Sequence, residues 1–266
     1  MGIMSLVMAC DGGAMSSDNI TYQRLEDVPA AKWEKLARKK IYFGHQSVGY
    51  NILDGIAAIM AQYPKIKLNI VETADASDFR VGVLAHSTVG KNVDPTSKIN
   101  DFSNYINQGI GKKADFAALK FCYVDIAPET DVDKMLGEYT QSVEALKRKY
   151  AGVKFIHFTS PLTINQTGYK AWIKKLLGRS PYGMQENVKR HEYNQLLLQK
   201  YLDKEPVFDI ATIESTFPDG SRATFQYDGK SYYSLVPEYT SDGGHLNELG
   251  QKKVASQFLV FLANLV

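Results

Sequence analysis

The stretch KKIYFGHQSVGYNI, Lys39 to Ile52, decides the fold because it has the pattern of a strand that runs directly into a helix. The apolar letters IYF before Gly44 are typical of a buried strand, and the apolar residues after Gly49 recur at helical spacing. Ser47 stands at the junction. A serine there either caps the helix by accepting a backbone hydrogen bond, or is a nucleophile that a tight turn exposes above the sheet. This stretch by itself leaves both roles open.

The composition indicates one large globular domain. The 266 residues are 44% apolar and 23% charged, which is enough for a sizeable core and argues against disorder. The formal charge of +2 lacks the basic excess that nucleic-acid binding needs, so we expect no nucleic-acid partner. The two cysteines cannot form a CxxC-type metal site, and no two histidines have the i, i+4 spacing of a helix-borne zinc site. We therefore expect neither a metal nor another cofactor.

Residues 1–24 have the composition of a tail and not of a folded element. The letters VMAC, which end at Cys10, resemble the end of a bacterial lipoprotein signal, and a Gly/Ser/Asp-rich tether follows. The short apolar run has no basic region before it, which departs from such a signal. We expect a bacterial cell-envelope protein, periplasmic or on the surface, that meets the membrane only through a lipid anchor at Cys10. A plain cytoplasmic N-terminus is the alternative, and residues 25–266 form a single domain in either case.

Strand and helix patterns alternate along residues 25–266. About five such repeats predict a three-layer α/β/α domain with a central five-stranded parallel sheet. The apolar run ADFAALKFCYVDI, 114–126, is expected to be a central strand buried on both faces, whereas VGVLAHSTVGKN, 81–92, is expected to be a loop or a short strand. The letters TFQYDGKSYYSL, 224–235, predict a hairpin about Asp-Gly, which either borders a ligand crevice or is an insertion without a role.

A second informative stretch, SDGGHLNELG, 241–250, places Asp242 and His245 three residues apart on a loop before the last helix. A carboxylate at this spacing can reach Nδ1 of the imidazole, fix its tautomer and stabilise the imidazolium. The other ring nitrogen is then free to take a proton from a hydroxyl. In a parallel sheet this loop can return to the edge where Ser47 stands. The pair therefore favours the nucleophile role for Ser47 over the cap.

With these residues the chain resembles the SGNH (GDSL-type) hydrolases, a superfamily of esterases, lipases and carbohydrate deacetylases. The likeness covers nearly the whole chain after the tail and is most specific in the Asp-x-x-His block at 242–245. The first block departs from the family, since Gly44-His45-Gln46-Ser47 stands where Gly-Asp-Ser is usual. The resemblance implies a flavodoxin-like SGNH hydrolase fold, with Ser47 as nucleophile, His245 as base and Asp242 as orienting acid.

The resemblance also implies an oxyanion hole. The family uses the nucleophile's own N–H, a glycine N–H after the second strand and an asparagine amide after the third. Ser47 supplies the first donor, and Gly90 is expected to supply the second. The region after the third strand has no asparagine, so Asn92, two residues past Gly90, is expected to replace it. The side chains expected to contact substrate are His45, Gln46 and Asp125, with packing or a second base as alternatives for His45.

The expected activity is hydrolysis of acyl esters through a covalent acyl-enzyme on Ser47. The expected substrate is a small-molecule or polysaccharide ester, O-acetylated carbohydrate above all, on the grounds of family analogy and location. Two alternatives stay open. The same triad could transfer the acyl group to a sugar hydroxyl instead of to water. The absent asparagine favours a third hypothesis, a carbohydrate-binding protein on a hydrolase scaffold that has lost its activity.

Overall fold

The computed structural model describes residues 21–166, 176 and 182–266. The part of the tail that carries Cys10 lies outside these residues, so the lipid anchor and the cell-envelope location stay predictions. Tyr22, which the sequence assigns to the tail, packs on the folded domain, because its backbone N–H and carbonyl oxygen both pair with the Asn264 side chain. No helix in the described ranges is long and apolar enough to cross a bilayer.

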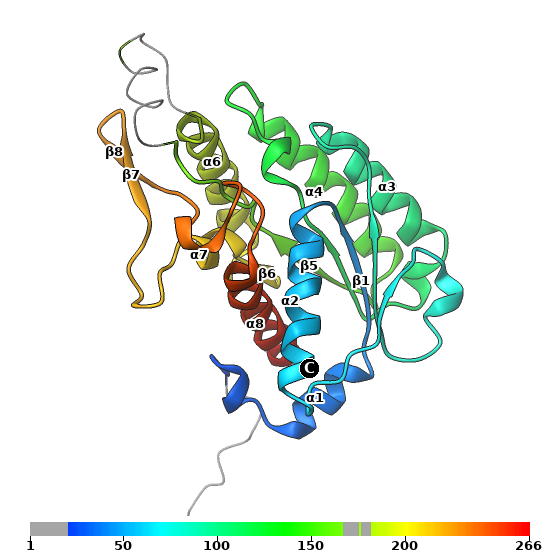
Figure 1. The fold of residues 1–266 in the computed structure, drawn as a ribbon. Coiled ribbons are helices and arrows are strands. Elements are labelled where there is room, and N and C mark those ends of the chain that lie inside the picture. The colour runs from blue at the N-terminus through cyan, green and yellow to red at the C-terminus, as the bar shows by residue number, and fades with distance from the viewer. Residues whose placement is uncertain (1–20, 167–175, 177–181) are drawn as a thin grey trace, which may run out of the picture.

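The fold is built on a parallel sheet of six strands in the order β2-β3-β1-β4-β5-β6 (Figure 1). The expected number of five was wrong, because residues 81–92 contain a full strand, β3, between β2 and β1. The polar residues His-Ser-Thr at its end obscure the strand pattern in the sequence, although the first four residues of the strand are buried. The strands span Lys40–His45 (β1), Ile70–Glu72 (β2), Val83–Thr88 (β3), Phe116–Leu119 (β4), Lys154–Phe158 (β5) and Val207–Phe208 (β6).

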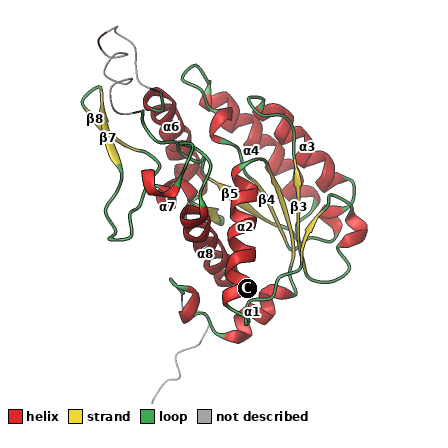
Figure 2. Cartoon of the chain, viewed as in Figure 1, coloured by secondary structure: helices red, strands yellow, loops and turns green. Residues whose placement is uncertain are grey.

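Helices cover both faces of the sheet and complete the three predicted layers (Figure 2). On one face α1, α2 and α8 form a core with alternate strand residues such as Phe43, and α2 and α8 lie side by side (Figure 1). On the other face α3, α4 and α6 pack on the remaining strand residues, such as Tyr42. The helices span Ala30–Ala37 (α1), Val48–Gln62 (α2), Pro95–Asn107 (α3), Val132–Lys149 (α4), Met184–Tyr201 (α6), Ile210–Glu214 (α7) and Glu248–Asn264 (α8).

Three neighbouring strands end at the edge of the sheet where Ser47 stands. β1 pairs with β3 on one side and with β4 on the other, and His45 is level with Thr88, the last residue of β3. β4 is shorter than the expected 114–126 strand: it ends at Leu119, and Tyr123–Asp125 forms a 3-10 turn. The loops after β1, β3 and β4 therefore meet at one edge, as ligand-binding loops of parallel sheets do.

The Asp-Gly hairpin is present as β7 (Thr224–Tyr227) and β8 (Lys230–Tyr233), so this prediction is confirmed. Asp228 and Gly229 have φ values of 46° and 72°, the positive angles that a two-residue hairpin turn requires. A cleft of about 720 Å³ lies between the hairpin and the loop after β5, with Ile164 in its wall. The hairpin therefore borders a crevice.

Candidate active site

The backbone at Ser47 adopts a conformation that a helix cap does not need. Its φ and ψ are 44° and −101°, and its side chain makes no capping hydrogen bond to α2. A positive φ is uncommon for a residue with a Cβ, and such strain concentrates at functional turns. The turn is held by two backbone bonds, from the Gly49 N–H to the Gln46 oxygen at 2.8 Å and from the Tyr50 N–H to the Ser47 oxygen at 2.9 Å. Ser47 therefore stands at the N-cap position of α2 without capping the helix through its side chain.

The structure brings Ser47, His245 and Asp242 into one chain of hydrogen bonds. The Ser47 hydroxyl oxygen lies 2.5 Å from His245 Nε2, and His245 Nδ1 lies 2.7 Å from Asp242 Oδ2. With the proton of the neutral ring on Nδ1, the imidazole donates to the carboxylate and accepts from the serine. This is the arrangement in which a histidine can take a proton from a serine.

The Asp242 carboxylate is fixed by its own loop. Its Oδ1 accepts hydrogen bonds from the backbone N–H of Gly244 at 2.9 Å and of His245 at 2.8 Å. Burial raises the pKa of this carboxyl, but the hydrogen bonds from the Gly244 N–H and from the His245 ring and N–H outweigh this effect. The net result is a pKa lowered to about 2. Asp242 is therefore ionised at neutral pH and holds the Nδ1–H tautomer of His245.

Other elements clamp the loop that carries His245. The Ile164 N–H, from the loop after β5, donates to the Gly243 oxygen at 2.9 Å. On the far side the Leu246 N–H donates to the Asn51 side chain of α2 at 3.1 Å. Asn247 then caps α8, its Oδ1 accepting from the Leu249 and Gly250 N–H groups. The position of the imidazole is thus set by the sheet, α2 and α8 together.

Tyr123 is a site residue that the sequence did not indicate. Its hydroxyl oxygen lies 3.5 Å from both His245 ring nitrogens, and its ring meets the imidazole edge-on at 5.6 Å between centroids. A Cβ on Gly244 would approach the Tyr123 ring to 2.7 Å, so a side chain there would push the ring out of its place. Burial, together with the nearby Asp242 charge, raises the pKa of Tyr123 to about 12. Its position after β4, where an asparagine was sought, was the only available signal.

The expected oxyanion donors do not all stand free. The Gly90 N–H already donates to the Asp101 carboxylate at 2.8 Å. This corrects the assignment of Gly90, because a carboxylate is a strong acceptor that occupies the N–H. Within the described residues, the Ser47 backbone N–H donates to no protein acceptor. Asn92 is exposed, and its Oδ1 accepts from Lys98 Nζ at 2.9 Å, which leaves its Nδ2 as a donor.

Two of the three expected substrate contacts are buried. His45 is fully inaccessible, and its Nε2 lies 3.1 Å from His86 Nδ1. Burial lowers the pKa of His45 to about 3, and the ring fills the space that Gly49 leaves. Asp125 is also buried and pairs with Lys98 at 2.6 Å. The assignments of His45 and Asp125 to substrate contact were therefore wrong, since neither side chain reaches solvent.

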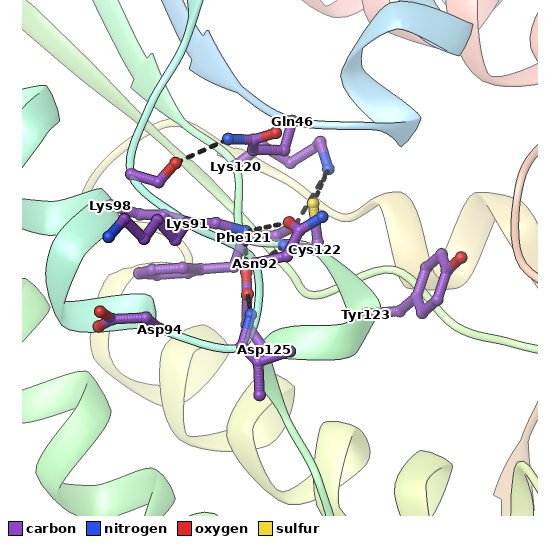
Figure 3. Close-up of polar contacts among 12 residues, drawn as sticks. Gln46, Lys91, Asn92, Asp94, Lys98, Lys120, Phe121, Cys122, Tyr123 and Asp125 are labelled. Carbon is purple, nitrogen blue, oxygen red and sulfur yellow. Dashed lines mark hydrogen bonds and ion pairs between the residues drawn. The ribbon is translucent and has the colours of Figure 1, made fainter.

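Gln46 is half-buried and links two of the site loops. Its Nε2 donates to the carbonyl oxygens of Val89 and Gly90, at 3.1 and 2.8 Å. Figure 3 shows Gln46 beside the loop that carries Asn92.

Among the described residues, no group of three or more His, Cys, Asp or Glu side chains is arranged to hold a metal ion.

Comparison with known proteins shows which known structures share this architecture. No protein-family model and no curated protein matches the chain. A GDSL-like lipase from Bacteroides thetaiotaomicron matches 88% of this chain and 91% of its own, at 13% identity and a TM-score of 0.51. The periplasmic domain of a lipopolysaccharide acetyltransferase from Salmonella ser. Paratyphi A matches 83% of this chain and 82% of its own, at 13% identity and a TM-score of 0.47. The match to the GDSL-like lipase, together with the topology of the sheet, shows that the chain has the three-layer α/β/α fold of the GDSL-type (SGNH) hydrolases.

Proposed function

We propose that this protein is a serine esterase that hydrolyses acyl esters with Ser47 as nucleophile, His245 as general base and acid, and Asp242 as the orienting carboxylate. The observation that carries the proposal is the unbroken hydrogen-bond chain from the Ser47 hydroxyl through His245 to Asp242. It joins a strained turn on β1 to a loop before α8, and a strained serine beside a histidine has no evident role in packing.

The reaction follows from the positions of these atoms. Ser47 Oγ attacks the ester carbonyl while His245 Nε2 takes its proton, and the developing imidazolium is stabilised by ionised Asp242. The Ser47 N–H and Asn92 Nδ2 are the proposed donors to the oxyanion. His245 then gives its proton to the leaving alkoxide, which leaves an acyl group on Ser47. Water, activated by the same histidine, releases the acid.

The proposed substrate is an O-acetylated carbohydrate. The cleft beside the hairpin supports this class, since Phe217 and Phe225 offer rings, while Asn165 and Gln166 offer amides. Rings and amides are the groups that bind hydroxylated ligands. The cleft adjoins the catalytic loop, because Ile164 in its wall packs on Gly243. An envelope location with a lipid anchor at Cys10 belongs to the same proposal.

Hydrolysis is favoured over transfer to a second sugar. The side chains of His245 and Asp242 are 44% and 57% exposed, so water reaches the acyl-enzyme from the open side. An acyltransferase has to keep water from its acyl-enzyme. The transferase alternative predicts a new acetylated product when a sugar acceptor is added.

The deciding experiment compares p-nitrophenyl acetate hydrolysis by the wild type, Ser47→Ala and Ser103→Ala. Ser103 is the matched control, because its hydroxyl bonds Ser142 between α3 and α4, away from the triad. We expect Ser47→Ala to abolish activity and to block labelling by a fluorophosphonate, while Ser103→Ala keeps both. A folded wild type that releases p-nitrophenol no faster than Ser47→Ala rejects the esterase. Sugar binding by that inactive protein would then support the binding-protein alternative.

A further inference from the structure

We propose that the buried Lys98–Asp125 ion pair is a positioning device that turns the Asn92 amide nitrogen toward the oxyanion. The inference rests on the proposed function and adds two residues that do not touch the substrate. Figure 3 shows Lys98, Asp125 and Asn92 together, with the Asn92 oxygen on the Lys98 side and its nitrogen on the opposite side.

The pair is completely removed from water. Lys98 Nζ lies 2.6 Å from Asp125 Oδ2, and both side chains are 0% exposed. Burying two charges costs more than their attraction returns unless further hydrogen bonds are made. Here the pair makes three: Lys98 Nζ donates to Asn92 Oδ1, and Asp125 accepts from the Val93 N–H and the Cys122 N–H. An apolar pair would fill the same space, so we infer that polar positioning is its purpose.

The cation decides which way the Asn92 amide faces. A carboxamide beside a lone carboxylate would turn its NH₂ toward the negative oxygen. Lys98 stands between, and its ammonium group can only donate, so Asn92 must present Oδ1 to it at 2.9 Å. The amide nitrogen is thereby turned away from Asp125. Without Lys98, the amide is free to flip and offer an oxygen to the oxyanion, which would repel it.

The backbone around Asn92 is held by the same pair. Val93, an exposed β-branched residue, has a φ of 67°, a strained angle for such a side chain. Its N–H donates to Asp125 Oδ1 at 2.9 Å, which holds the strained turn in place. On the other side, the Gln46 amide binds the Gly90 oxygen at 2.8 Å, so the residue next to Ser47 holds the start of the Asn92 loop. The loop is thus fixed at both ends, with Asn92 between.

The first test reads the Asn92 side chain directly, without catalysis. The ¹⁵N side-chain signals of Asn92 are identified by their loss in Asn92→Ala. We expect a rigid amide in the wild type and a mobile one in Lys98→Met. The matched control is Lys147→Met, which breaks the 2.6 Å pair with Glu205 beside α4 and should leave Asn92 rigid. An Asn92 amide equally rigid in Lys98→Met overturns the proposal, even if the protein hydrolyses no ester.

The second test uses activity and an exposed residue, so that folding is not at risk. Asn92→Ala should lower kcat on p-nitrophenyl acetate by about 100-fold with KM little changed, the loss typical of one oxyanion donor. Asn92→Asp keeps an oxygen for Lys98 and puts the other where Nδ2 was, so it should be several-fold slower still. If Asn92→Asp is as active as Asn92→Ala or more active, the amide does not face the oxyanion and the inference fails.

A combined variant separates this inference from the esterase proposal. In folded Lys98→Met protein, kcat should fall to the level of Asn92→Ala, and adding Asn92→Ala should cost less than twofold more, since both changes remove one function. Losses that multiply overturn the inference while leaving the triad intact. If Lys98→Met does not fold, the comparison of Asn92→Asp with Asn92→Ala decides alone.

Discussion

The Ser47 hydroxyl oxygen lies 2.5 Å from His245 Nε2, although 198 positions separate the two residues in the chain. The contact depends on two turns with positive φ, at Ser47 after β1 and at Gly243 before α8, with angles of 44° and 96°. Each turn is held by hydrogen bonds of its own. The pair is therefore preorganised, and in the proposed esterase much of the cost of bringing base and nucleophile together is met on folding.

The Asp242 carboxylate should be essential although it lies outside the reacting pair. In Asp242→Asn, the side-chain NH₂ competes with His245 Nδ1–H, which favours the wrong tautomer of the base. We expect kcat to fall by about 100- to 10,000-fold. Asp219→Asn is the control, because Asp219 accepts the Ser221 N–H in a surface turn in the same way. A loss below about tenfold in Asp242→Asn, measured with p-nitrophenyl acetate, would mean that Asp242 does not orient the base.

Tyr123 should act through its ring more than through its hydroxyl. The hydroxyl is 3.5 Å from both His245 nitrogens, the outer limit of a hydrogen bond, whereas the ring packs on Gly244 and edge-on against the imidazole. Tyr123→Phe should keep kcat within about threefold, and Tyr123→Ala should lower it at least about tenfold, because the catalytic loop loses its support. Tyr150→Phe, which loses a bond to Asn107 elsewhere, is the control. Equal losses in Tyr123→Phe and Tyr123→Ala would instead assign the role to the hydroxyl.

The sequence was sufficient for the layers and for the pairing of Asp242 with His245, because both depend on local patterns. Apolar periodicity predicted the β-α alternation, and the Asp-Gly turn predicted the hairpin. Asp242 and His245 lie three residues apart, so their hydrogen bond is a property of one loop. For β3 the sequence left a loop and a short strand as alternatives, because its last three residues, His86 to Thr88, are polar, and the end of a strand tolerates polar residues where a loop follows.

The oxyanion region could not be predicted because its contacts join segments that are distant in the chain. Nothing near Gly90 in the sequence shows that the carboxylate of Asp101, eleven residues later on α3, takes its N–H. The charge pair of Lys98 and Asp125 lies 27 residues apart and looks like two solvated residues until burial is known. His45 has the appearance of a site residue for the same reason, since only the structure shows that it is sealed beneath Gly49.

Glu214 should make the protein less stable as the pH rises toward 8. Burial raises the pKa of this carboxyl from 4.5 to about 8, although the Leu162 N–H and the Lys120 and Arg190 charges lower it. The folded state thus holds a proton that the unfolded chain releases above pH 4.5. The contribution of Glu214 is fully present below pH 4.5 and is lost as the pH rises to 8, with a slope of up to about 1.4 kcal/mol per pH unit.

Glu214→Gln removes this titration and tests the assignment. Urea unfolding between pH 5 and pH 8 should show a smaller decrease of the unfolding free energy in Glu214→Gln than in the wild type. Glu144→Gln is the control, since Glu144 is a half-buried partner of Lys147 on the surface of α4. A wild type and a Glu214→Gln variant with parallel pH profiles would show that Glu214 does not carry the proton.

Gly49 should be intolerant of any side chain because the His45 ring occupies the space where that side chain would lie. A Cβ there would lie 2.3 Å from the His45 ring, which is shorter than the contacts that real Cβ atoms make. Gly49→Ala should therefore lower the free energy of unfolding by about 1 to 3 kcal/mol, the usual cost of overpacking.

Gly137→Ala gives the opposite control, because this exposed position in α4 has nothing within 4 Å of a new Cβ. It should stabilise the protein by about 0.5 to 1 kcal/mol through helix propensity alone. Urea unfolding of both variants checks the contrast, and a Gly49→Ala variant as stable as Gly137→Ala would show that His45 can move aside. Because His45 and Gly49 each lie two residues from Ser47, a shift of the His45 ring in the same variant should also displace the Ser47 hydroxyl and lower the proposed esterase activity.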